Sequence, residues 1–116
     1  MRVLVCGGRD YRNPAKVRAV LSDLRKERGI DLLIHGAASG ADSAADAWAR
    51  VVGVDQVHFP ANWNGRGKAA GPYRNALMLQ LMPPDLVVAF PGGRGTADMV
   101  ARAEAMGIEV CEIETV

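Results

Sequence analysis

Short apolar runs alternate with helix-like segments along this chain, and this alternation limits the fold more than any other feature. The apolar runs at 3–6, 32–35, 57–59, 86–90 and 108–113 are predicted strands. Strands that alternate with helices form a parallel sheet with right-handed crossovers. We therefore predict an α/β fold: a three-layer sandwich built on a parallel five-stranded sheet, with strand order 3-2-1-4-5.

Four segments between these runs are predicted helices. Two have apolar residues every three or four positions, as an amphipathic helix requires. The positions are Val17, Val20, Leu21 and Leu24 in one, and Ala41, Ala44, Ala45, Trp48, Val51 and Val52 in the other. Residues 73–82 and 96–106 give two further helices with a less regular pattern.

The 13 glycines fall into two classes by position. Gly29, Gly53 and Gly107 lie where three helices are predicted to end, in left-handed caps. The others follow predicted strands: Gly7, Gly8, Gly36, Gly40, Gly65, Gly67, Gly71, Gly92, Gly93 and Gly95. The carboxyl ends of parallel strands meet at one edge of a sheet, and open α/β sheets bind ligands in the crevice there. The glycines therefore predict a binding edge.

The segment "PGGRGT" at 91–96 joins the fourth strand to a helix. Gly92, Gly93 and Gly95 let backbone amides approach a ligand, and the helix that follows presents its positive end to an anion. Thr96 suits an N-cap or a hydroxyl donor to phosphate, and Arg94 adds charge at the rim. A tight turn with an exposed arginine would explain the same letters without a ligand.

Two other loops reach the same edge. After the first strand, Gly7 and Gly8 permit close approach of a ligand to the backbone. Arg9 and Asp10 bring a cation and a carboxylate to the switch point, where the strand order changes direction between the first and fourth strands. Pro14 suits the first turn of the helix that follows. In the loop that contains Gly36, the pair Ser39 and Asp42 resembles a capping box, and Asp42 could instead face the crevice. His35 is interpreted as a hydrogen-bonded strand-end residue, and His58 is given no role.

Residues 60–78 form the one extended polar loop that the sequence predicts. Loops of this length inside a compact domain tend to be binding loops or lids. Trp63 or Tyr73 could stack on a base, and Arg66 and Lys68 could contact phosphate. Each of these side chains could instead be half-buried packing or a solvated charge. Arg74 lies one turn into the next helix and is followed by Asn75, so it is a better-positioned anion contact than the cations of the loop.

Bulk properties narrow the class of protein. Residues 1–116 fit a single domain, and no apolar run approaches the ~20 residues that cross a bilayer. We expect no signal peptide, no membrane contact and a cytoplasmic location. A net charge of +1 and 5% aromatic residues make nucleic acid an unlikely partner. Cys6 and Cys111 fall on non-adjacent strands, so both are predicted free and buried. No metal site or cofactor is predicted.

Four motifs carry a family resemblance. In order, "VLVCGGRD", "HGAASGAD", "AGPYRN" and "DLVVAFPGGRGTADMV" resemble the YspA/YpsA-related branch of the SLOG superfamily. That superfamily also holds the lonely-guy phosphoribohydrolases and the DNA-processing protein DprA. The resemblance spans nearly the whole chain and implies a Rossmann-like fold. It also implies a single nucleotide-binding domain over residues 1–116, often as a homodimer. The apolar helix "NALMLQLM" is either an exposed dimer patch or core.

The resemblance also bears on mechanism. Lonely-guy enzymes cleave an N-glycosidic bond with an arginine, which Arg74 matches, and a glutamate, whose position holds Met99. Asp98 is adjacent, but one residue turns a helix by about 100°, so it does not simply replace the glutamate. Asp10 and Asp42 are the candidates for a substitute carboxylate.

Three functions follow from these observations. The leading hypothesis is a sensor or sequestering protein for a nucleotide-like ligand. The second is a nucleotide N-glycosidase or phosphoribohydrolase, and the third a DprA-like nucleic-acid binder. The predicted ligand-binding residues are Gly7, Gly8, Arg9, Asp10, Gly36, Asp42, Trp63, Arg74, Asn75, Pro91, Gly92, Gly93, Arg94, Gly95 and Thr96.

Overall fold

The computed structural model describes residues 1–115, and for Asn64 the backbone alone. Five parallel strands form one sheet in the order β3-β2-β1-β4-β5, so the predicted fold class and strand order are confirmed. The strands are β1 (Arg2–Cys6), β2 (Leu32–His35), β3 (Asp55–His58), β4 (Leu86–Ala89) and β5 (Glu109–Glu112).

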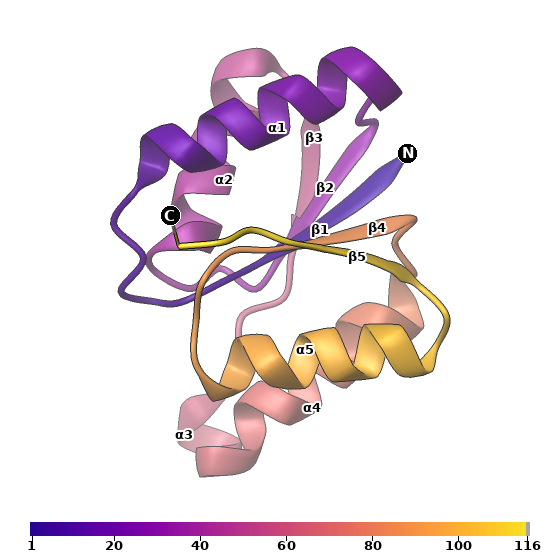
Figure 1. The fold of residues 1–116 in the computed structure, drawn as a ribbon. Helices are drawn as coiled ribbons and strands as arrows, with labels where there is room; N and C mark the ends of the chain where they lie inside the picture. The colour runs from indigo at the N-terminus through magenta and orange to yellow at the C-terminus, as the bar shows by residue number, and fades with distance from the viewer. Residues whose placement is uncertain (116) are drawn as a thin grey trace.

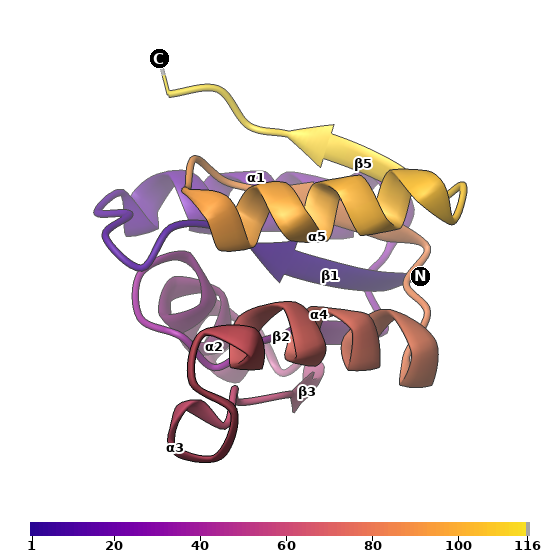
Figure 2. The same ribbon diagram turned by 90° about the horizontal axis from the view of Figure 1, so that it is seen from below.

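Helices cover both faces of the sheet and complete the three layers (Figures 1 and 2). The helices α1 (Pro14–Arg28) and α2 (Ala41–Val52) pack together on one face. The helices α4 (Ala70–Leu81) and α5 (Arg94–Ala105) pack together on the other. Figure 2, seen from below, shows α4 and α5 side by side in front of the sheet.

The segment predicted as a long loop is mostly helical, so that prediction was wrong. It holds α3 (Trp63–Arg66), the 3-10 turn η1 (Gly67–Ala69) and the start of α4. The side chain of Asn62 accepts a hydrogen bond from the Gly65 amide at 3.0 Å and caps α3. A single turn of helix has too few residues to produce a periodic pattern, which is why the sequence reads as a loop.

Alternate residues of the central strands fill two separate cores. Val3 and Val5 of β1 pack with α1 and α2, whereas Leu4 packs with Met78 of α4 and Met99 of α5. Side chains of a strand point to opposite faces in turn, so a strand with both faces covered reads as a continuous apolar run.

Local signals set the helix ends. The Asn13 side chain accepts a hydrogen bond from the Lys16 amide at 3.1 Å, and Pro14 opens α1 as predicted. Gly29, Gly53 and Gly107 all have positive φ, near 75°, as expected of residues that end helices. Gly53 has the predicted left-handed conformation, whereas Gly29, with ψ 135°, does not. The periodic pattern fails at Val51, which is 86% exposed in the last turn of α2.

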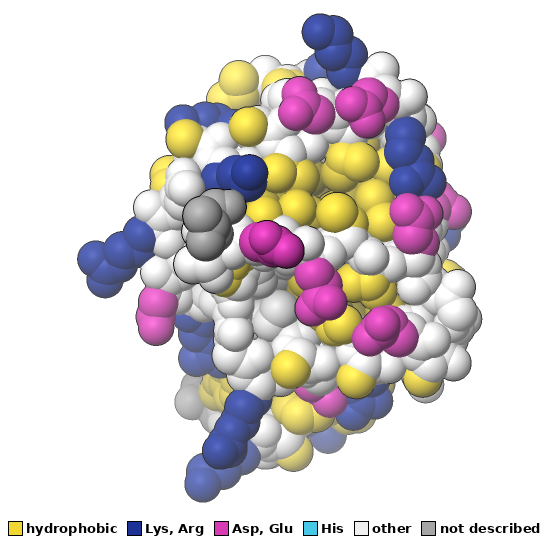
Figure 3. All heavy atoms as spheres, viewed as in Figure 1, with side chains coloured by type: hydrophobic (Ala, Val, Ile, Leu, Met, Phe, Trp, Pro, Cys, Tyr) yellow, Lys and Arg dark blue, Asp and Glu magenta, His cyan; other side chains and the backbone are white. Residues whose placement is uncertain are grey.

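One face of the sheet is incompletely covered near β5. In the view of Figure 1, α1 lies above β5, and Figure 3 shows hydrophobic side chains at the surface between them. Cys111 of β5 is exposed, which corrects the prediction of two buried thiols, while Cys6 is half-buried. Both are free, and β4 lies between their strands. Within the described residues, no helix is long and apolar enough to span a membrane.

Candidate ligand site at the carboxyl edge of the sheet

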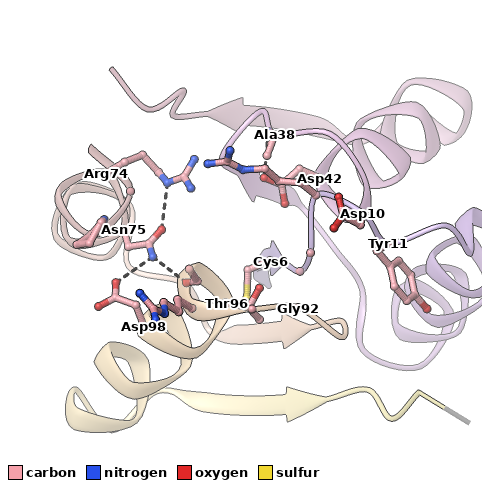
Figure 4. Close-up of a pocket in the computed structure, with 18 of the residues that line it drawn as sticks. Cys6, Asp10, Tyr11, Ala38, Asp42, Arg74, Asn75, Gly92, Thr96 and Asp98 are labelled. Carbon is pink, nitrogen blue, oxygen red and sulfur yellow. Dashed lines mark hydrogen bonds between the residues drawn. The ribbon is translucent and has the colours of Figure 1, made fainter. Parts of the chain in front are cut away.

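A cavity of about 760 Å³ opens at the carboxyl edge of the sheet (Figure 4). It lies at the switch point, where neighbouring strands β1 and β4 lead to helices on opposite faces. Its walls are the loops after β1, β2 and β4 and the amino-terminal parts of α3, α4 and α5. The lining residues are Cys6, Gly7, Gly8, Arg9, Asp10, Tyr11, Ala38, Asp42, Trp63, Lys68, Gly71, Pro72, Arg74, Asn75, Pro91, Gly92, Gly93, Arg94, Gly95, Thr96 and Asp98.

The cavity brings together every residue predicted to bind ligand except Gly36. Gly36 lines a neighbouring cavity of about 330 Å³, which shares Arg9, Ala38, Trp63 and Arg74 with the first. Predicted residues up to 89 positions apart in the sequence, Gly7 and Thr96, therefore meet at one edge. Their role as ligand contacts stays a prediction.

The start of α5 faces this cavity without a cap. Its N-cap residue is Gly93, no described side chain accepts a hydrogen bond from the amides of its first turn, and that turn holds no acidic residue. The first amides of a helix have no partner within the helix, so this end is suited to an anion. Thr96 is the third residue of α5, which corrects its predicted place as N-cap.

Gly93 and Gly95 differ from the other glycines of this edge. A Cβ added at either would have no described atom within 4 Å, apart from its own chain neighbours and helix backbone. Neither glycine has positive φ. Gly95 lies within α5, so packing and backbone conformation leave its missing side chain unexplained, whereas Gly93 has a ψ of −140°, outside the extended range. Both residues line the cavity.

The glycines after β1 have a packing reason besides the ligand contact that the sequence predicts. A Cβ on Gly7 would lie 2.6 Å from Cβ of Ala41, and one on Gly8 would lie 3.0 Å from the Pro91 carbonyl. The Gly8 amide already donates to that carbonyl at 2.9 Å. These glycines let the loops pack against one another, and both also line the cavity.

Asp42 does not form the capping box predicted with Ser39. Its Oδ2 accepts hydrogen bonds from the amides of Gly36 at 3.1 Å and Ala38 at 3.2 Å. Ser39 instead donates to the Arg9 carbonyl at 3.2 Å. The N-cap of α2 is Gly40, whose φ is 75°. The carboxylate thus organises the loop before α2, and burial raises the pKa of Asp42.

Arg74 and Asn75 hold the far wall of the cavity. Arg74 Nη1 donates to the carbonyls of Gly36 at 2.8 Å and Phe59 at 3.3 Å, and Nε donates to Asn75 Oδ1 at 3.0 Å. The buried Asn75 amide donates in turn to the Gly95 carbonyl at 3.1 Å. Part of the guanidinium is therefore committed to the fold, and burial lowers the pKa of Arg74 from its usual value.

Asp98, which sequence reasoning set aside, lines the cavity. Its Oδ2 accepts from Asn75 Nδ2 at 3.0 Å (Figure 4). The same oxygen accepts from Arg102 Nε at 2.9 Å. Met99, at the position of the family glutamate, is 1% exposed and packs in the core below the sheet. The rotation of about 100° that separates the two side chains places the aspartate, not the methionine, at the cavity.

Aromatic residues from the same region divide between the cavity and the surface. Trp63 lines the cavity and is 45% exposed, and the Arg9 guanidinium lies 4.5 Å from its ring centroid. Arg66 stacks on Tyr73 at 3.5 Å, and neither lines the cavity. Lys68 does line it.

One group of residues in the described part of the chain has the spacing of metal ligands. Ligand atoms of His35, Asp46 and His58 lie within 4.8 Å of one another. The Ala37 amide donates to Nδ1 of His35 at 3.0 Å, which places the ring proton on Nε2, and Nε2 lies 3.0 Å from Gln56 Oε1. His35 therefore has no free lone pair for a metal. This agrees with its interpretation as a hydrogen-bonded strand-end residue.

Comparison with known proteins agrees with the fold and the motifs. A sequence model of the YspA, cpYpsA-related SLOG family matches residues 1–65, which contain the loops after β1 and β2. The chain is also 37% identical over 120 residues to the Gene 61 protein of Mycobacterium phage D29. That match covers 94% of this chain and 93% of the phage protein. With its sheet order and its glycine-rich edge, the chain belongs to the YspA, cpYpsA-related SLOG family.

Proposed function

We propose that this protein binds a nucleotide or a nucleotide-derived small molecule in the 760 Å³ cavity, as a sensor or a sequestering protein. The observation that carries the proposal is the uncapped start of α5, where Gly93 and Gly95 are open towards the cavity. Amides and helix dipole together favour a phosphate at such a position. Membership of the SLOG family supports a nucleotide-related ligand.

The charges around the cavity suit the rest of such a ligand. Arg9, Lys68, Arg74 and Arg94 bring four cations, against the carboxylates of Asp10, Asp42 and Asp98. The partly exposed ring of Trp63 offers a surface on which a base can stack. A ligand with an anionic end and a planar end matches this distribution.

A thermal-shift panel tests the proposal. Its members are nucleoside monophosphates, ADP-ribose, NAD and signalling nucleotides, with inorganic phosphate as the minimal probe. A ligand at 100 times its Kd adds about 2.7 kcal/mol to the free energy of unfolding. For a chain of this size, that raises Tm by roughly 10 °C. No stabilisation by any member, at concentrations well above a micromolar Kd, would contradict the proposal.

A second candidate function is hydrolysis of the N-glycosidic bond of a nucleotide. The observation in its favour is that three carboxylates, Asp10, Asp42 and Asp98, line the same cavity as Arg74. A carboxylate stabilises the oxocarbenium-like centre of such a reaction or positions the attacking water.

Chromatographic detection of free base separates the two functions. Hydrolysis predicts that nucleoside monophosphates release base, and that Arg74→Ala abolishes the release. Arg66→Ala is the matched control, because Arg66 lies outside the cavity on Tyr73 and its loss should leave the rate unchanged. Release no faster than in buffer would exclude hydrolysis of these substrates and leave binding alone.

A further inference from the structure

Asp42 carries a buried oxygen atom that has no hydrogen-bond partner. Its Oδ2 accepts from two backbone amides, but Oδ1 is buried and unpartnered among residues 1–115. Leaving such an acceptor unpaired costs about 1–3 kcal/mol, so native structures rarely contain one without a reason. The side chain is 5% exposed and lines the candidate ligand cavity.

Arg74 does not pair with this oxygen. Arg74 lies close enough to stabilise the carboxylate through space, yet its Nη1 is held by the carbonyls of Gly36 and Phe59. No salt bridge joins Arg74 and Asp42 in the described structure. Arg74 therefore supplies positive charge to the pocket around Asp42 without donating a hydrogen bond to Oδ1.

These surroundings restrict the donor that could complete the site. The small exposed fraction of Asp42 admits a narrow group rather than a ring. Arg9 and Arg74, which line the same cavity, disfavour a cationic donor on the ligand beside them. A neutral hydroxyl meets both conditions, because it donates one hydrogen bond and carries no charge.

We propose that Asp42 Oδ1 accepts a hydrogen bond from a sugar hydroxyl of the ligand, so that the cavity recognises a sugar phosphate rather than phosphate alone. The proposal rests on the proposed function, because it assumes that the phosphate binds at the start of α5. Asp42 then acts as a specificity residue: the α5 amides hold the anion, and the carboxylate requires a hydroxyl on the same ligand.

Isothermal titration with two probes tests this role. Ribose 5-phosphate carries hydroxyls, whereas methyl phosphate is a phosphate monoester without one. A hydrogen bond to a carboxylate predicts that native protein binds ribose 5-phosphate at least tenfold more tightly than methyl phosphate. In Asp42→Asn, the amide oxygen can still accept from Gly36 and Ala38, but a donor replaces the free acceptor. The ratio of the two affinities should therefore fall below about threefold, with the Kd of methyl phosphate nearly unchanged.

Asp23→Asn is the matched control, because it removes the same charge from an exposed residue of α1 that lines neither cavity. Its affinity ratio should stay at the native value. A native ratio near one overturns the role of Asp42 even if the Asp42 variant does not fold, and so does a folded Asp42→Asn protein that keeps the native ratio. If neither probe nor any nucleotide binds native protein, the proposed function itself fails, and this role fails with it.

Discussion

Asp42 links the stability of the fold to pH. Its carboxylate organises the loop before α2 while losing most of its contact with water. Burial raises the pKa of Asp42 above the value of about 3.9 that an unfolded chain has. The folded protein therefore binds this proton more tightly than the unfolded chain. The stability that results is fully present below the unfolded pKa and is lost as the pH rises through the folded pKa.

Asp42→Asn removes this titration. The native protein loses this stability as the pH rises, and the variant does not. We therefore expect the free energy of unfolding of the variant, minus that of the native protein, to increase from pH 4 to pH 7. Urea unfolding at the two pH values measures the change. A difference between the two proteins that is the same at both values would contradict the shifted pKa.

The two thiols should react at very different rates. Burial, with the nearby carboxylate of Asp42, raises the pKa of Cys6 to about 12, so almost none of it is thiolate at pH 8. Cys111 is exposed on the edge strand β5. With iodoacetamide at pH 8, mass spectrometry of the intact chain should show one rapid addition at Cys111 and a second that is slower by at least tenfold. Equal rates at both residues would contradict the environment described for Cys6.

At the scale of elements, α5 combines a weak helix start with a site for anions. Gly95 is its second residue, and glycine within a helix costs about 0.5–1 kcal/mol relative to alanine. No described atom would clash with a methyl group there. The sequence therefore keeps a residue that weakens the helix without a packing reason, as binding at this position would require.

Gly95→Ala should raise Tm by about 2–4 °C and weaken the binding of the panel ligand at least tenfold, because the methyl group enters the cavity. Scanning calorimetry and titration measure the two effects. Ser43→Ala is the control: Ser43 is exposed on α2 away from both cavities, so stability should rise and affinity stay unchanged. A stabilised Gly95→Ala protein with native affinity would show that the anion of the ligand does not bind at the start of α5.

At the scale of the whole molecule, α4 divides its apolar residues between core and surface. Met78 and Leu79 are buried, whereas Tyr73 is 44% exposed and Leu81 62% exposed. Tyr73, Leu77 and Leu81 recur every four positions and lie along one side of the helix. We propose this ridge as the contact of a homodimer. The hydrophobic surface between α1 and β5 is the competing candidate (Figure 3).

Sedimentation equilibrium tests the homodimer. Native protein should behave as a dimer, and Leu81→Arg should shift it to monomer. Val51→Arg is the matched control, because Val51 is an exposed apolar residue of α2 on the opposite layer and its change should leave the dimer intact. A native monomer at micromolar concentration would contradict the proposal. Dissociation by Val51→Arg alone would place the interface on α2.

The sequence by itself determined the sheet order, the layers and the edge at which polar and glycine-rich loops gather. These properties depend on patterns that repeat within a few residues, such as the buried run of β4 or the helix stop at Gly53. They also depend on the chirality that parallel strands share.

Only the tertiary structure decided what each residue of that edge does. Gly8 allows its loop to pack on Pro91, 83 positions away, which the local sequence does not show. Asp42 bonds to the loop before its own helix instead of capping it with Ser39, and Asp98 rather than Met99 reaches the cavity. Such roles depend on which loops meet and on how each helix is rotated about its axis. Both follow from contacts between distant segments, which a local pattern does not contain.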